Sequence, residues 1–337
     1  MINKIYDKTI SFIKENFKQL LLLVILLLVL NYPLNYSICI SGGTINVNDR
    51  INIENSYESK GTFNLAYVTE LRATTLTYLL SYLVPSWERV ALEEYQASTN
   101  ETMEDIGTRS KLYLNKSEQD AIKLAYEKAN KIIEINNTKF IVVYVNEIVD
   151  TDIKIGDQIL EINGKKISDL SQYKQEVMNT EVDKYINLKV KRNNKELHFK
   201  IKVNNIEGNK LTGISILELS DFNTNPDITL SFKESESGPS GGLMLTLAIY
   251  DKLITPDLTK GKKIVGTGTI NEDGTVGQID GIKYKLKGAV KAKADIFIAP
   301  SGKNYDECKK IIEEKNYDIQ LIEAKTFDKV LELLIAL

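Results

Sequence analysis

A six-residue turn in the C-terminal half of the chain constrains its fold most strongly. The turn, Ser237-Gly238-Pro239-Ser240-Gly241-Gly242, precedes a run from Leu243 to Tyr250 that is almost free of polar residues. Glycine and proline favour a sharp entry into a helix, and the glycines after Ser240 let another backbone segment approach its hydroxyl. A helix that starts here points unpaired N–H groups and the positive end of its dipole at that hydroxyl. The turn therefore predicts either an N-cap serine on a buried helix or a serine placed for chemistry.

Composition and charge exclude several classes of protein. The 337 residues suit two or three modest domains. With 43 basic and 46 acidic residues, the net charge of −3 gives no basic surface for nucleic acid. Cys39 and Cys308 lie far apart in the sequence, so we expect neither a disulfide nor a metal cluster. A nucleotide-binding Gly-x-x-x-x-Gly-Lys-Ser/Thr loop is also missing from the sequence, so no cofactor is expected.

An apolar segment near the N-terminus predicts a membrane anchor. Leu20 to Leu30 is eleven unbroken aliphatic residues, and the stretch continues less strictly to Ile40. Counted from Gln19, it reaches the ~20 residues that a helix needs to cross a bilayer. A cleaved signal peptide is the alternative, but the small-x-small pattern of a cleavage site does not follow. We therefore expect a transmembrane helix over residues 19–40.

The distribution of basic residues predicts the orientation of this helix. Lys4, Lys8, Lys14 and Lys18 precede it, whereas residues 41–53 hold only Arg50. By the positive-inside rule, residues 1–18 are expected in the cytoplasm and everything after residue 40 outside the cell. The sequence thus predicts a single-pass protein of the cell membrane with an extracellular catalytic domain.

Residues 41–138 are expected to form a mixed α/β extracellular region. Residues 44–47 and 62–69 alternate like the two strands of a hairpin, and residues 74–84 are apolar without a clear helix or strand period. Ser117 is expected to cap a helix whose apolar residues recur at helical spacing. These residues are Ala121, Leu124, Ala125 and Ala129.

Residues 139–204 resemble a PDZ domain of the type found in bacterial proteases. After a strand at 140–145, the motif Ile155-Gly156-Asp157 leads into the hairpin Ile159-Leu160-Glu161-Ile162-Asn163-Gly164. A short helix and strands at 186–191 and 197–203 follow. PDZ domains bind extended peptides by adding a strand to a sheet edge. A small β-rich spacer without ligand is the alternative interpretation.

Residues 211–337 alternate between strands and helices, which predicts an α+β domain. The expected strands are 212–217, 228–232, 263–270, 294–299 and 319–322, and the expected helices are 240–252, 281–292, 305–315 and 327–336. If Ser240 is a nucleophile here, its base cannot easily be a histidine, because His198, the one histidine, lies in the PDZ-like segment. Lysine, aspartate or glutamate remain as candidate bases.

Lys285 has the position that a neutral lysine needs. Ile282, Leu286 and Ala289 form the apolar stripe of the helix beginning at Gly281, and Lys285 lies inside that stripe. Burial there disfavours the charged form of lysine, so its pKa moves toward neutrality and it can accept a serine proton. The alternative is a surface lysine whose stem lies along the apolar face.

The motifs of residues 211–337 in their order resemble the proteolytic domain of the Lon family. They are Gly-Pro-Ser-Gly-Gly at 238–242, Val-Gly-Thr-Gly-Thr-Ile at 265–270, Gly-x-Val-Gly at 274–277, Gly-Ile-Lys-x-Lys at 281–285 and Ile-Phe-Ile-Ala-Pro at 296–300. The resemblance implies a Ser-Lys dyad of Ser240 and Lys285, with the hydroxyl of Thr267 orienting the lysine. The backbone N–H groups of Ser240 and Gly241 are candidates for the oxyanion hole.

The resemblance extends to domain organisation and has two departures. An N-terminal anchor followed by a PDZ domain is similar to the membrane-anchored Lon-like proteases of Gram-positive bacteria, which carry no ATPase module. Gly241 stands where the family often has alanine, and Ser237 stands where many members have an acidic residue. The second departure leaves open whether Glu234 or Glu236 takes part near the site.

These observations predict an α+β, ATP-independent serine endopeptidase. It would be anchored in the bilayer through residues 19–40 and would cleave peptides or unfolded segments, with the PDZ domain recognising the substrate; a homo-oligomer stays open. The alternative is a membrane-tethered peptide-binding protein whose Lon-like domain is catalytically silent.

Overall fold

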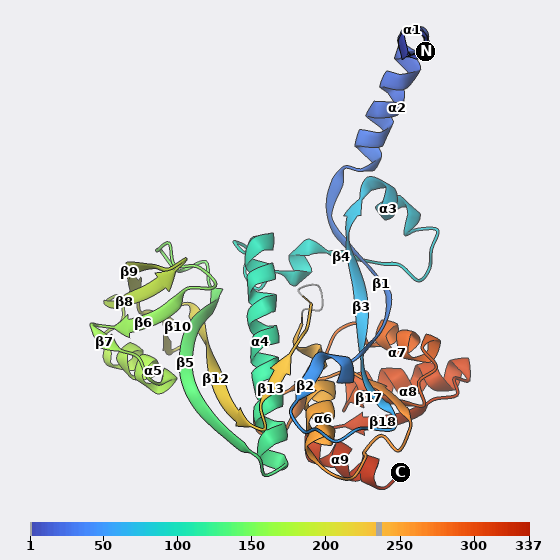
Figure 1. Cartoon of the computed structure of the whole chain (residues 1–337). Helices are drawn as coiled ribbons and strands as arrows, with labels where there is room; N and C mark the ends of the chain where they lie inside the picture. The colour runs from blue at the N-terminus through green and yellow to red at the C-terminus, as the bar shows by residue number, and fades with distance from the viewer. Residues whose placement is uncertain (1, 234–237) are drawn as a thin grey trace. The chain divides into compact units, whose positions relative to one another are not determined.

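The computed structural model describes residues 2–233 and 238–337 (Figure 1). The described residues have a mixed α+β fold and divide into two compact units. The first unit comprises residues 1–40 and 69–95, and the second comprises 41–68 and 96–337. Glu234, Glu236 and Ser237, the acidic candidates and the departure from the family pattern, lie outside the described residues.

The first unit is built from short helices and the outer ends of two long strands. β4 pairs antiparallel with β1, so that Tyr36 lies opposite Ala91 and Cys39 opposite Glu88. Its elements are α1 (Ile2–Glu15), α2 (Phe17–Leu30), the first part of β1 (Pro33–Asn46), the last part of β3 (Thr62–Thr74), α3 (Thr75–Leu80), β4 (Glu88–Ala91) and the 3-10 turn η2 (Leu92–Tyr95).

The predicted transmembrane helix over 19–40 is wrong. α2 has fourteen residues, which at 1.5 Å per residue is about 21 Å, against the ~30 Å of a bilayer core. The helix stops because Pro33 has no N–H to continue it, and a residue before proline disfavours the helical conformation. β1 begins at Pro33. Across residues 2–233 and 238–337, every helix is too short or too polar to span a membrane. The single-pass location, with its cytoplasmic N-terminus and extracellular catalytic domain, is contradicted by the same finding.

A parallel sheet organises the C-terminal part of the second unit. The sheet has six strands in the order β18-β17-β14-β3-β1-β4, and the neighbouring pairs from β18 to β3 are parallel. All five residues of β17 are buried, as expected for a parallel strand covered on both faces. The elements are β14 (Lys263–Gly266), β15 (Thr269–Ile270), β16 (Val276–Gly277), α7 (Ile282–Lys291), β17 (Ile296–Pro300), α8 (Lys303–Lys315), β18 (Gln320–Ala324) and α9 (Phe327–Ile335).

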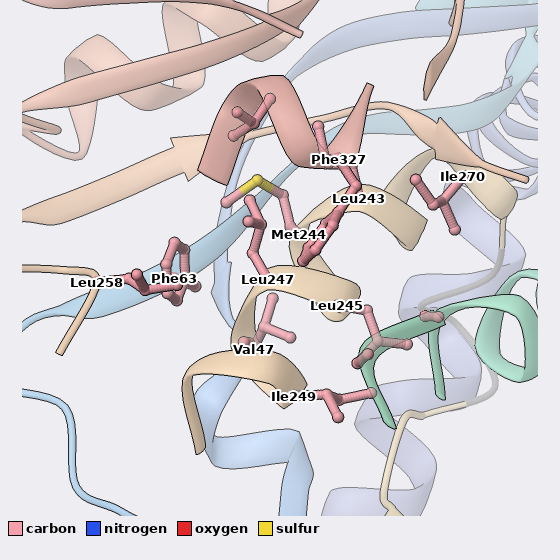
Figure 2. Packing of buried hydrophobic residues seen from close by; sticks show 14 of the residues in the cluster. Val47, Phe63, Leu243, Met244, Leu245, Leu247, Ile249, Leu258, Ile270 and Phe327 are labelled. Atoms are coloured by element: carbon pink, nitrogen blue, oxygen red, sulfur yellow. The ribbon is translucent and has the colours of Figure 1, made fainter. Parts of the chain in front are cut away.

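Helix α6 (Gly242–Leu253) lies at the centre of this part of the core. It is apolar on nearly every face, which is typical of a helix surrounded by other elements. Figure 2 shows Leu243, Met244 and Leu247 packed among Phe63, Phe327 and other buried side chains from distant parts of the sequence. The turn that precedes α6 is therefore attached to a rigid element.

A second long helix, α4 (Met103–Lys128), packs against α6 (Figure 1). Its N-cap is Thr102, whose side chain accepts from the Asp105 N–H, while the Asp105 carboxylate accepts from the Thr102 N–H. The prediction that Ser117 caps a helix is wrong, because that residue lies in the middle of α4 and is buried. The helix begins earlier, at the capping box of Thr102, because this box satisfies two N–H groups of the first turn.

The PDZ-like part of the second unit has its own core. The sheet order is β12-β5-β6-β8-β9, and β12 pairs with β5 from Ile214 opposite Val145 to Asn225 opposite Ile132. The elements are β5 (Ile132–Val145), β6 (Gln158–Ile162), β7 (Lys165–Lys166), α5 (Leu170–Asn179), β8 (Tyr185–Arg192), β9 (Lys195–Lys202), β10 (Asn204–Ile206), β11 (Asn209–Leu211) and β12 (Ile214–Asn225). Two further strands, β2 (Ile51–Ile53) and β13 (Ile228–Leu230), pair with each other, and the 3-10 turn η1 (Asn48–Arg50) precedes β2.

Candidate active site

The turn around Ser240 is a single 3-10 turn, η3 (Pro239–Gly241), that runs directly into α6. Gly238 enters it with a φ of +130°, a conformation that residues with a side chain rarely adopt. Within the turn, the Gly242 N–H donates to the Pro239 carbonyl. Ser240 is thus held at the N-terminal end of a buried helix, where the helix dipole is positive.

Lys285 reaches this turn from α7. Gly281 has a left-handed conformation (φ +69°) and starts the helix. The apolar stripe predicted from the sequence is buried, and Lys285 is buried within it at 5% exposure, whereas Lys283 and Lys287 are exposed. Helical spacing thus predicted which of these lysines is buried.

Three side chains meet at the turn. Lys285 Nζ lies 2.9 Å from Ser240 Oγ and 3.1 Å from Thr267 Oγ1. The Thr267 hydroxyl donates to the Ser240 carbonyl oxygen at 2.9 Å, so its proton is directed there and its lone pairs face the lysine. Thr267 is fully buried between β14 and β15. The distance between Nζ and Oγ permits proton transfer between a neutral lysine and the serine hydroxyl.

Backbone hydrogen bonds to Gly268 also hold the turn around Ser240. The Gly268 N–H donates to the Ser240 carbonyl at 2.7 Å, and the Leu243 N–H donates to the Gly268 carbonyl at 3.1 Å. Gly241 follows Ser240 in the turn, and a Cβ there would lie 2.8 Å from the Cδ2 atom of Leu65. The N–H groups of Ser240 and Gly241 stay predictions for the oxyanion hole.

One polar contact at the turn was not predicted. Ser117, in the middle of α4, donates its hydroxyl to the Pro239 carbonyl at 3.1 Å. The sequence offers a weak signal for it, namely a serine at helical spacing from Ala121 and Leu124 on the buried face of the helix. His198 lies on β9 of the PDZ-like sheet, opposite Lys189.

A groove of about 880 Å³ lies along the edge strand β12 and helix α5. One face of α5 lines it through Tyr173, Val177 and Met178, and β12 contributes Ile214 and Ile216. β12 ends the sheet order, so its outer edge faces this groove. An edge strand beside an apolar helix face has the shape that accepts an extended peptide.

Comparisons with known proteins match the PDZ-like part and the part around Ser240 to two different families. Residues 133–203 match the family of PDZ domains, and residues 224–337 match the Lon protease (S16) C-terminal proteolytic domain. Among curated proteins, none matches the chain.

Two solved PDZ domains are each similar to about a quarter of the chain. The PDZ domain of an SdrC-like protein from Listeria monocytogenes is 20% identical, covers 25% of this chain and 93% of its own, and has a TM-score of 0.23. The PDZ domain of an SdrC-like protein from Listeria innocua is 24% identical, covers 23% of this chain and 92% of its own, and has a TM-score of 0.22. On the family matches, the chain combines a PDZ domain with a Lon-type proteolytic domain, which supports a PDZ-containing Lon-like protease.

Proposed function

We propose that the chain is a serine endopeptidase that uses Ser240 as nucleophile and Lys285 as general base. The observation that carries the proposal is the 2.9 Å distance between Lys285 Nζ and Ser240 Oγ, at a lysine that is 5% exposed. Burial disfavours the charged ammonium, and only the neutral amine can accept the serine proton.

The reaction follows from this geometry. Ser240 Oγ attacks the carbonyl carbon of a peptide bond as its proton passes to Lys285 Nζ. The resulting oxyanion is stabilised by backbone N–H groups at the start of α6, for which Ser240 and Gly241 are the candidates. Lys285 then returns the proton to the leaving amine, and an acyl-enzyme remains on Ser240. Water, deprotonated by the same lysine, hydrolyses the acyl-enzyme and restores the serine hydroxyl.

Thr267 keeps the lysine in place during these steps. Its hydroxyl proton is directed at the Ser240 carbonyl, so Lys285 can only donate to it. This arrangement holds Nζ beside Ser240 Oγ in every protonation state. None of the steps consumes a nucleotide, and we propose that hydrolysis proceeds without ATP.

The PDZ domain is proposed to select the substrate. An extended peptide would add to the outer edge of β12 and place apolar side chains against Tyr173 and Val177 in the groove. Such a ligand must be unfolded locally, so the substrates are peptides, flexible segments or unfolded chains.

The experiment is covalent labelling of the purified full chain with a fluorophosphonate probe, together with hydrolysis of a fluorogenic peptide library in the absence of ATP. We expect labelling that maps to Ser240 and cleavage that Ser240→Ala abolishes. Labelling and cleavage that persist in Ser240→Ala would refute the nucleophile. A wild-type chain that binds peptides but shows neither reaction would favour the catalytically silent alternative.

A further inference from the structure

The two peptide planes that flank the nucleophile are held by hydrogen bonds from different elements. The Ser240 carbonyl, which follows the nucleophile, accepts from Thr267 and Gly268 of the parallel-sheet region. The Pro239 carbonyl, which precedes it, accepts from the Gly242 N–H within the turn and from the Ser117 hydroxyl of α4 at 3.1 Å. α4 lies outside residues 224–337, the segment that matches the proteolytic family.

Ser117 lies within a helix, but its hydroxyl donates to a carbonyl outside that helix. A mid-helix serine commonly bonds the carbonyl four residues earlier in its own helix. Ser117 donates to another element instead, and it is buried at 6% exposure. The approach is close because Gly242 has no side chain: a Cβ there would lie 2.6 Å from Ser117 Oγ. The turn and the helix are thus in direct contact at this point.

Fixing the Pro239 carbonyl also fixes the Ser240 N–H. The two groups belong to one planar trans peptide unit, so they point in opposite directions. With the carbonyl oxygen held toward α4, the N–H of Ser240 must point to the opposite side of the turn. This N–H is a candidate donor to the oxyanion in the proposed function.

We propose that Ser117 is a positioning residue for the oxyanion hole, which holds the Pro239–Ser240 peptide plane so that the Ser240 N–H meets the developing negative charge. The inference rests on the proposed function of Ser240. The substrate oxygen is negative only in the tetrahedral state, so the contribution of Ser117 belongs to the transition state and not to substrate binding.

The test compares Ser117→Ala with Ser117→Thr, which retains a hydroxyl, and with Gln119→Ala as matched control. Gln119 lies on the same helix and its side chain accepts from the Ser220 N–H at 2.8 Å, so its loss also removes one hydrogen bond between α4 and a neighbouring element. The measurements are kcat and KM for a peptide substrate and the affinity for a peptide boronic acid. The boronic acid forms a tetrahedral anionic adduct on the serine and so reports on the oxyanion hole independently of turnover.

Because Ser117 acts through one neutral hydrogen bond, we expect Ser117→Ala to lower kcat by about tenfold and to weaken boronic acid binding by about the same factor. KM should stay within about twofold, and Ser117→Thr should recover most of the loss. Gln119→Ala should lower the melting temperature without either kinetic effect.

Unchanged kcat and boronic acid affinity in a folded Ser117→Ala variant would overturn the inference. So would losses of the same size in Gln119→Ala, since these would show a general effect of destabilising α4. An inactive wild type that no probe labels would instead refute the proposed function itself, and this outcome is recognised before any variant is compared.

Discussion

The two neighbouring lysines of α7 differ only in the face that they occupy. Lys285 is buried beside Ser240, whereas Lys283 is exposed with its Nζ 5.0 Å from the Tyr284 ring. Residues two apart on a helix point about 200° apart, so one of the two can reach the site. Loss of a general base costs about 10²–10⁴-fold.

We therefore expect Lys285→Ala to abolish peptide cleavage as completely as Ser240→Ala, and Lys283→Ala to remain substantially active. Turnover by the purified variants is the measurement, with circular dichroism to confirm folding. An active Lys285→Ala enzyme would overturn the mechanism.

Thr267 allows a separate test of lysine orientation. Thr267→Val keeps the shape of the side chain but removes both the bond to Ser240 and the acceptor for Lys285. Lys285 becomes a charged ammonium as it takes the serine proton, and a hydrogen bond to a charged group contributes about 1.5–3 kcal/mol, so kcat should fall by about 10- to 100-fold. Thr267→Ser, with its hydroxyl intact, should stay within a few fold of wild type. Equal activity of the valine and serine variants in steady-state kinetics would mean that the hydroxyl has no part in catalysis.

At the scale of elements, the approach of α6 to its neighbours depends on Gly242 but not on Gly241. A Cβ at Gly242 would lie 2.7 Å from Ile270 Cγ2 and 3.1 Å from the Ile270 backbone nitrogen, which cannot move independently. Gly242→Ala should therefore destabilise the fold by about 1–3 kcal/mol in urea denaturation, the usual cost of overpacking. At Gly241 the near atom is the Cδ2 end of Leu65, which can rotate away. Gly241→Ala should be close to neutral, and a larger loss for Gly241→Ala than for Gly242→Ala would contradict this packing.

The contact between α4 and the β15–β16 hairpin gives a pH-dependent prediction. Glu272 of the hairpin lies 2.7 Å from Lys116 and 2.5 Å from Lys123, and its bonds to these lysines lower its pKa from about 4.5 to about 2. A carboxyl whose pKa is depressed by folding stabilises the fold fully above its ordinary value, and this contribution is lost as the pH falls toward the folded value.

We expect Glu272→Gln to lower the melting temperature at pH 7 by a small amount, because the side chain is 48% exposed and solvent screens the pair. The difference from wild type should shrink between about pH 4.5 and pH 2, measured by calorimetry. The exposed Lys329–Glu332 pair supplies the control, since Glu332→Gln should have almost no effect at any pH. A difference that grows on acidification would contradict the assigned ion pairs.

Elements with a continuous apolar pattern were predictable, and contacts between distant elements were not. The helix predicted over 240–252 is α6, Gly242–Leu253, because its apolar run leaves little choice. The role of Ser117 depends on a carbonyl 122 residues away, which a local pattern cannot show. The helix predicted over residues 19–40 is wrong because the apolar residues after Pro33 belong to a strand and do not continue the helix. The spacing of apolar residues on α7 correctly predicted that Lys285 is buried, because burial follows helical periodicity.

At the scale of the molecule, the pairing of β5 with β12 shows where the chain can be cut to remove the PDZ domain. β5 and β12 form a continuous antiparallel pair, in which Thr138 lies opposite Ser220. The buried residues of the PDZ core all lie between Phe140 and Val203, and the side chains packed around them extend only to Ile216. The core around α6 takes none of its residues from this span. Replacing residues 139–219 by Asn-Gly would therefore join the two strand ends as a short hairpin and leave the second core intact.

We expect this variant to fold and to label Ser240 at about the wild-type rate, because the bond between Gln119 and the Ser220 N–H is retained along with the whole Ser240 turn. Cleavage of a short fluorogenic peptide should change by less than about threefold. Cleavage of an unfolded protein should fall by at least about tenfold, since a tethered substrate reaches the site at a high effective concentration. Circular dichroism, probe labelling and the two cleavage assays are measured on the same preparation. If a folded variant could not be labelled, the PDZ domain would be part of the active-site structure; if protein cleavage were unchanged, the groove beside β12 would not recruit the substrate.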